Sequence, residues 1–201
     1  MKDNNPDTKN QIFTTALRLF SSNGYENVTV RDIANAVGIK AASIYNHYES
    51  KENILQACYD FYLKNRYLER PEKDHYEAII KNGTKEEVMN ILNYTFESSI
   101  YENMVFAVFI IYARVYTDSK AREIHLSELN DSMHYLKEVF EFGIKNGRFD
   151  SFNVPAISLI IMSARLFTGQ SARMKPEEKP EWHNAQKDFF SEFEKMIPFR
   201  Y

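Results

Sequence analysis

Residues 29–55 read TVRDIANAVGIKAASIYNHYESKENIL, and this stretch decides the fold. Thr29 is followed three residues later by Asp32, which is the spacing of a capping box, with Asp in place of the usual Glu or Gln. Gly38 stands directly after the short apolar face of residues 30–37, where a helix end favours a residue that tolerates positive φ. These signals predict a short helix over residues 30–37 that ends in a tight turn.

A second short helix is predicted over residues 40–46, and two short helices joined by a Gly-containing turn form a helix-turn-helix. We expect Ile44 and Tyr48 to face inward, toward the apolar face of the first helix. The other side then carries polar and lightly basic side chains, namely Lys40, Ser43, Asn46 and His47. A recognition helix in the DNA major groove needs such a face, although an ordinary solvated helix has the same periodicity.

Lys51 favours the DNA-binding interpretation. It lies in the first turn of the helix that Ser50 caps and that we expect over residues 50–66. A cation there opposes the positive end of the helix dipole, at a cost of about 0.3–1 kcal/mol. A DNA phosphate would offset this cost, because it would meet the free backbone N–H groups and the lysine together.

The composition of the chain limits which class of protein it can be. It has 201 residues, 44% of them apolar, and a net charge of −3, which is not the basic balance of a typical DNA-binding domain. Net charge therefore does not indicate DNA binding, and only the positions of individual charged residues can do so. The polar N-terminus has no signal-peptide core, and the longest apolar runs are about half the length of a membrane span. We predict a cytoplasmic protein with no membrane partner, in which Cys58 is a small apolar core residue or a redox-sensing thiol.

Helical periodicity along the rest of the chain predicts an all-α fold with about nine to ten helices. A first helix ends at Asn23-Gly24, and the fourth is the one over residues 50–66. The charged stretch over residues 71–83 is assigned no helix. Later helices are expected over residues 84–99, 103–117, 119–146, 153–171 and 181–196.

The run GIKAASIYNHYESKENIL, residues 38–55, resembles the DNA-binding region of TetR-type repressors and aligns with it without gaps. The stretch TVRDIA at residues 29–34 adds to this resemblance, which covers about residues 9–56. It implies a three-helix DNA-binding domain over residues 1–50, joined through the fourth helix to a helical effector-binding and dimerisation domain over residues 51–201. It also favours repression over activation.

The resemblance implies a role for each matched residue. Thr29, Tyr45 and Lys51 would hold backbone phosphates, and Arg31 would reach a base or a phosphate at the edge of the groove. His47 would contact phosphate or pack against the recognition helix. The positions that set sequence choice would be Lys40, Ala41, Ala42, Ser43 and Asn46.

Two of these positions depart from a polar reading helix. Ala41 and Ala42 cannot form hydrogen bonds with bases, but they can touch thymine methyl groups. Few base contacts therefore remain for one copy of the chain. We expect a homodimer on a palindromic operator, formed through residues 153–171 and 181–196, because the first of these helices is apolar on more than one face.

The helices between residues 84 and 171 offer a candidate ligand site. Aromatic and Met side chains are frequent between residues 84 and 171, and they form either plain core or the wall of a pocket for a small hydrophobic effector. Arg114 and Arg165 lie within apolar runs, where a guanidinium must be paired. Arg114 would anchor an anionic group of the ligand, or it would form an internal salt bridge, for instance with Glu97, Glu102 or Glu123. The candidate ligand residues are Tyr94, Met104, Phe109, Tyr112, Arg114, Met133, Met162 and Arg165.

Two other classes of function compete with a DNA-binding regulator. No metal-binding, nucleophile or phosphate-loop motif occurs, so we expect neither an enzyme nor a cofactor or metal. A grouping of His125, Glu128 and Asp131 on one helix face does not change that expectation. The remaining alternative is a helical protein-interaction module that does not bind DNA, and such a module has no reason to keep Lys51 together with the polar face of residues 40–47.

Overall fold

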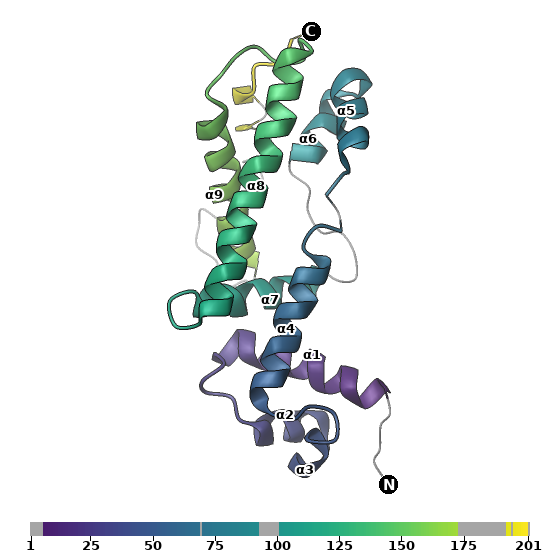
Figure 1. Ribbon diagram of the computed structural model, residues 1–201, viewed down its shortest axis with the longest axis vertical. Coiled ribbons are helices and arrows are strands. Elements are labelled where there is room, and N and C mark those ends of the chain that lie inside the picture. The colour runs from purple at the N-terminus through teal and green to yellow at the C-terminus, as the bar shows by residue number, and fades with distance from the viewer. Residues whose placement is uncertain (1–5, 69, 93–100, 173–191, 194, 201) are drawn as a thin grey trace. The chain divides into compact units, whose positions relative to one another are not determined.

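The computed structural model describes residues 6–68, 70–92, 101–172, 192–193 and 195–200, and these residues fold into helices (Figure 1). The helices are α1 (Pro6–Asn23), α2 (Val30–Val37), α3 (Ala41–Ile44), α4 (Lys51–Asn65), α5 (Lys73–Asn82), α6 (Lys85–Leu92), α7 (Tyr101–Arg114), α8 (Ser119–Lys145) and α9 (Val154–Ala172). In the described part of the chain, the β-type pairing is limited to an isolated bridge between Phe149 and Phe199. The predicted all-α fold class is confirmed.

The chain packs as two compact units. Unit 1 contains the described residues of 1–68 and 96–127, and unit 2 contains those of 69–95 and 128–201. Unit 1 therefore holds α1 to α4, α7 and the first part of α8. α4, which was expected to connect the DNA-binding domain to the rest of the chain, packs in unit 1 together with the helix-turn-helix.

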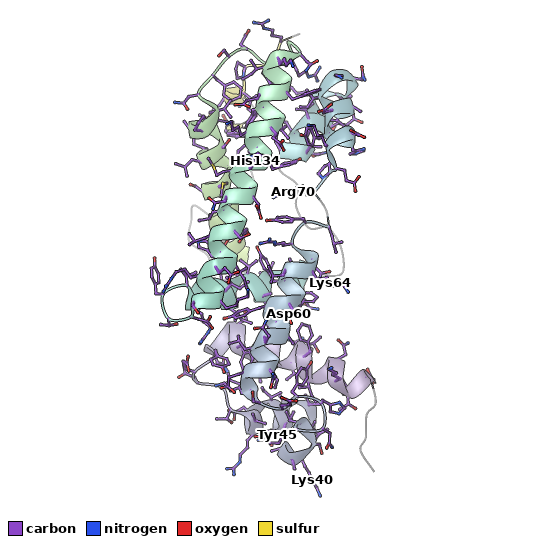
Figure 2. The ribbon with its side chains drawn as sticks, in the orientation of Figure 1. Lys40, Tyr45, Asp60, Lys64, Arg70 and His134 are labelled. Carbon is purple, nitrogen blue, oxygen red and sulfur yellow. The ribbon has the colours of Figure 1, made fainter. Side chains whose placement is uncertain are left out.

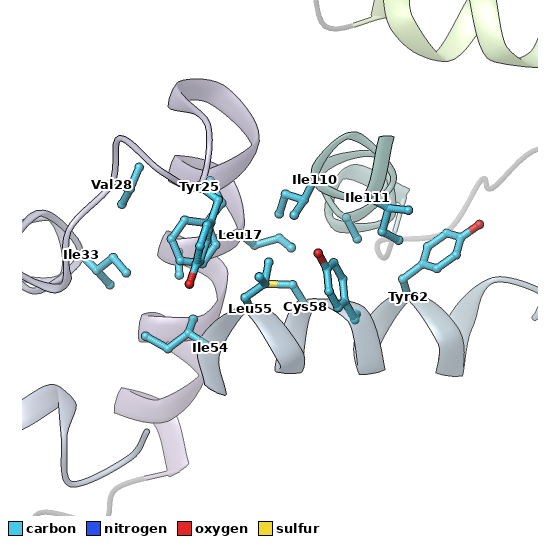
Figure 3. Packing of buried hydrophobic residues seen from close by; sticks show 14 of the residues in the cluster. Leu17, Tyr25, Val28, Ile33, Ile54, Leu55, Cys58, Tyr62, Ile110 and Ile111 are labelled. Carbon is cyan, nitrogen blue, oxygen red and sulfur yellow. The ribbon is translucent and has the colours of Figure 1, made fainter. Parts of the chain in front are cut away.

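The core of unit 1 explains why α4 and α7 pack with the N-terminal helices. α1 contacts α2, α4 and α7, and α4 contacts α7. Figure 3 shows Leu17, Ile33, Ile54 and Ile110 converging from four helices, each at most 2% exposed. Burial of one such side chain contributes about 1.5–3 kcal/mol, so the short α2 and α3 are held by packing more than by their own hydrogen bonds. Cys58 is buried in the same core, and burial raises its pKa to about 12, as expected for an unreactive core thiol.

The core of unit 2 surrounds the second part of α8. Tyr76 and Ile80 of α5 are buried in the same cluster as Phe140 of α8. α8 ends where the sequence predicts, since Gly147 has a φ of 74° and lies directly after Asn146. The chain beyond it brings Phe149 into the cluster, with its ring 5.8 Å from that of Phe140.

Most predicted helices are confirmed. α5, in the charged stretch 71–83, was not predicted, because its N-cap residue Glu72 makes no side-chain capping bond and only a short apolar face marks the helix. α7 ends at Arg114, three residues before the predicted end at 117, because Asp118 caps α8: its Oδ1 accepts from the backbone N–H groups of Lys120 and Ala121. The predicted segments 93–99 and 181–191 lie outside the described residues.

Candidate nucleic-acid interface

α2 begins and ends at local signals. The Thr29 Oγ1 accepts from the backbone N–H of Asp32 at 3.2 Å, and the backbone N–H of Thr29 donates to the Asp32 carboxylate at 2.7 Å. These two bonds complete the predicted capping box, and hydrogen bonds from the side chain and backbone of Thr29 lower the pKa of Asp32. Gly38 closes the helix with a φ of 80°. The turn toward α3 is therefore set by residues that the sequence identifies.

α3 is shorter than predicted, but its inner side is as expected. Regular helix covers Ala41–Ile44 rather than residues 40–46, and turn hydrogen bonds continue from Asn46 to Ser43 and from Tyr48 to Ile44. Ile44 is fully buried and Tyr48 is 9% exposed, so this side holds the segment against the core of unit 1.

The outer side of the α3 segment is open to solvent. Tyr45 is 56% exposed. Lys40 and Asn46 are also exposed, and both Lys40 and Tyr45 lie at the α3 end of unit 1 (Figure 2). The predicted reading positions divide by exposure as follows: Lys40, Ala42, Tyr45 and Asn46 are exposed, while Ala41, Ser43 and His47 are half-buried.

The N-terminus of α4 supplies the predicted phosphate-binding elements. The Ser50 Oγ accepts from the backbone N–H of Asn53 at 3.2 Å, so it caps the helix. The Lys51 Nζ donates to the backbone oxygen of Tyr25 at 2.7 Å, and Lys51 is half-buried. An ammonium group has three donors, so this bond leaves two for a phosphate. Thr29 and Arg31, the other predicted contacts beside the α3 segment, are exposed.

Tyr25 and Glu52 were missed by sequence reasoning. The Tyr25 hydroxyl donates to the Glu52 carboxylate at 3.0 Å, and burial together with this bond raises the pKa of Tyr25 to about 12. The Glu52 carboxylate is held by its own backbone N–H, by Ser50 and by Tyr25, and its pKa is lowered. The only signal in the sequence was an aromatic residue directly after the helix stop at Gly24. Its contacts come from a helix 27 residues further along the chain.

The described candidate ligand residues are divided between the two units. Met104 is buried in unit 1, where Phe109 and Tyr112 are half-buried, while Met133 and Met162 belong to unit 2. Tyr94 and the side chain of Arg165 lie outside the described residues.

Arg114 forms the internal ion pair that the sequence left open as an alternative. Its guanidinium lies 2.6 Å from the Glu26 carboxylate and 3.3 Å from the Asp118 carboxylate. These partners differ from the three that we had named, because they come from the turn after α1 and from the start of α8. Arg114 is therefore engaged with two carboxylates of its own unit.

The described residues give no sign of a metal site or of a membrane span. No described group of three or more His, Cys, Asp or Glu side chains is arranged to hold a metal ion. None of the described helices combines the length and the apolar character that a membrane crossing requires.

Comparison with known proteins agrees with this geometry. Residues 12–58 match the family model described as bacterial regulatory proteins, tetR family. IcaR of Staphylococcus aureus (strain Newman), a negative transcriptional regulator of the HTH type for the biofilm operon icaADBC, is 40% identical over 72 residues. That match covers 34% of this chain and 38% of IcaR, so the chain spans little more than a third of the length of this relative.

Solved structures extend the likeness of fold to most of the chain. PfmR, a TetR family transcriptional regulator from Thermus thermophilus, has a TM-score of 0.65 at 20% identity, over 92% of this chain and 97% of PfmR. KstR2, a ketosteroid transcriptional regulator of Mycobacterium tuberculosis, has a TM-score of 0.64 at 18% identity, over 96% of this chain and 95% of KstR2. The proteins matched are regulators rather than enzymes, in agreement with the sequence prediction.

Proposed function

We propose that this chain is a transcriptional repressor of the tetR family of bacterial regulatory proteins and that it binds specific double-stranded DNA. The observation that carries the proposal is the exposed side of the α3 segment, held in place by the buried Ile44 and Tyr48. Lys40, Tyr45 and Asn46 extend from it toward solvent. The capped N-terminus of α4 adds backbone N–H groups and Lys51 for phosphate.

The experiment is selection of bound sequences from a pool of random duplex DNA at about 100 mM salt. The purified full-length chain should enrich one motif over background. Asn46→Ala or Arg31→Ala should then weaken binding to that motif by about 1–3 kcal/mol and relax its sequence preference. Lys51→Ala should weaken all duplexes alike and reduce the salt dependence by about one unit.

Lys64 provides a matched control, because it is an exposed lysine at the other end of α4 (Figure 2). Lys64→Ala should leave affinity and salt dependence unchanged. A pool in which no sequence is enriched would instead favour the helical interaction module without DNA binding.

We extend the proposal to a homodimer on a palindromic operator, formed through residues 153–171 and 181–196. A recognition segment as short as α3 makes few base contacts, and a twofold pair doubles them. In α9, Ala156, Leu159 and Ser163 are exposed at helical spacing, and Leu159 is 60% exposed. Ala156 and Leu159 form the apolar part of the surface that we propose a second copy of the chain covers.

The last part of the proposal is release of the DNA by a small hydrophobic ligand. Its support is the family together with the apolar Met104, Phe109 and Tyr112 on α7, which packs against α1 and α4. Arg114 has no role as an anchor in this proposal, because two carboxylates already engage its guanidinium. A thermal-shift screen of hydrophobic compounds, followed by calorimetry with and without the selected duplex, tests it. By linkage, a true inducer must bind more weakly when DNA is present.

A further inference from the structure

Two cations of unit 1 contact the ring of Tyr25. The ammonium nitrogen of Lys51, on α4, lies 4.0 Å from the ring centroid. The guanidinium carbon of Arg114, at the end of α7, lies over the same ring at 4.4 Å. A cation over an aromatic face at these distances is attracted by the ring quadrupole, so the ring links the end of α7 to the start of α4.

We propose that Arg114 is a positioning residue for DNA binding, which fixes the Tyr25 ring and thereby holds the Lys51 ammonium at the N-terminus of α4. This inference rests on the proposed function, because it assigns to Lys51 the role of a phosphate contact. It gives Arg114, a residue of the helix outside the helix-turn-helix, a part in that contact without touching DNA.

Tyr25 controls the position of the lysine because it contacts Lys51 in two ways. Its backbone oxygen accepts from the Lys51 Nζ at 2.7 Å, and its ring lies under the same nitrogen. Lysine has a long stem with many rotamers, and holding it before DNA arrives removes part of the ordering cost of binding. A shift of the Tyr25 ring would therefore release the ammonium group into its other rotamers.

Arg114 can hold the ring because it is itself held from both sides. Glu26 follows Tyr25 in the chain, so the 2.6 Å ion pair ties the guanidinium to the turn that carries the ring. Asp118, which caps α8, holds the other side at 3.3 Å and also accepts from the Tyr59 hydroxyl at 3.0 Å. The two carboxylates balance the charge of Arg114, which limits its repulsion of Lys51 across the ring.

The rival explanation is that Arg114 only stabilises unit 1. Under it, Arg114→Gln would lower the melting temperature and would weaken DNA binding equally whether or not Lys51 is present. The salt dependence would then stay unchanged, because the number of phosphates neutralised would be the same. Under our proposal both quantities depend on Lys51.

The test is a double-mutant cycle with the full-length chain and the duplex selected above, titrated at several salt concentrations. We expect Arg114→Gln to weaken binding by about three- to tenfold in the wild type and by less than about twofold in the Lys51→Ala background. The slope of log affinity against log salt should fall by about 0.9 in Lys51→Ala and by part of that in Arg114→Gln. Equal losses in both backgrounds, or an unchanged slope in Arg114→Gln, would overturn the positioning role.

Two further measurements keep the test decisive if Arg114→Gln fails to fold. Glu26→Gln weakens the hold on Arg114 at a side chain that is 75% exposed, and it should show a smaller effect of the same kind, again absent without Lys51. In the protein without DNA, the ring current of Tyr25 should shift the ε-methylene resonances of Lys51 upfield, and Glu26→Gln should reduce this shift. If the wild type binds no duplex, the proposed function itself is wrong. If the wild type binds but the affinity losses of Arg114→Gln and Lys51→Ala are additive, only the role of Arg114 is wrong.

Discussion

Gly143 lies in α8 at a position where even one methyl group has no room. A Cβ built on this residue would meet two ring carbons of Phe149 at 2.2 and 2.3 Å. Carbon atoms prefer a separation of about 3.5–4.0 Å, so the ring would have to move by more than about 1 Å. Phe149 is 1% exposed, and its ring is confined by Phe140 at 5.8 Å and Phe199 at 5.1 Å between centroids.

Gly143→Ala therefore sets two effects against each other. In a helix interior, alanine is more favourable than glycine by about 1 kcal/mol. Overpacking of a confined core costs about 1–3 kcal/mol, and the 2.2 Å contact places this site at the upper end. We expect a net loss of about 1–2 kcal/mol, which corresponds to a fall in melting temperature of roughly 2–8 °C.

Thermal and urea unfolding measure this change. A second substitution, Phe149→Leu, shortens the confined side chain, so the double variant should lose less than the sum of the two single losses. A Gly143→Ala variant as stable as the wild type, or more stable, would refute the packing argument at this site.

Three other contacts lead to predictions of their own. Thr29→Ala removes a capping box and should lower the free energy of unfolding by about 0.5–2 kcal/mol and also weaken DNA binding. Thr84→Ala breaks the matching capping box with Glu87 in unit 2, so it should lower the free energy of unfolding by a similar amount without weakening DNA binding. The pKa of Asp118 is lowered, because backbone N–H groups and the Tyr59 and Arg114 side chains outweigh the opposing effect of burial. The Asp118 carboxylate therefore stabilises the fold above its unfolded pKa of about 3.9, and this stabilisation is lost as pH falls through its folded pKa. In urea unfolding at several acidic pH values, the free energy of unfolding of Asp118→Asn should therefore fall less steeply with decreasing pH than that of the wild type. In light scattering, the wild type should have about twice the 23.7 kDa mass of one chain, and Leu159→Lys should have the mass of a single chain. A wild type that is monomeric at micromolar concentration would contradict the proposed dimer.

The two ends of α2 and the start of α4 could be predicted because they depend on neighbours in the chain. The capping box of Thr29 and Asp32, the Gly38 stop and the Ser50 cap all join residues within three or four positions. Hydrogen bonds of this kind form as the helix forms, so the sequence pattern contains all of the information. The inward positions of Ile44 and Tyr48 follow from the same helical spacing.

α5 could not be predicted in this way. Its first turn has no side-chain capping bond, and its apolar face is short. An isolated helix of ten residues is marginal in water, so α5 depends on the burial of Tyr76 and Ile80 in the core of unit 2. A pattern within the segment does not report that burial.

The sequence by itself determined the all-helical class, the helix-turn-helix and its exposed reading side, because each depends on spacing within a few turns of helix. Only the tertiary structure decided that Glu26 pairs with Arg114, since Glu26 lies 88 residues earlier in the chain, whereas the second partner, Asp118, stands only four residues after Arg114. It also decided that the Tyr25 ring contacts both Lys51 of α4 and Arg114 at the end of α7. A charge within an apolar run shows that a partner is needed, because burial of an unpaired guanidinium is costly. The identity of that partner is set by the packing of α1, α4 and α7, which joins residues that no local spacing connects.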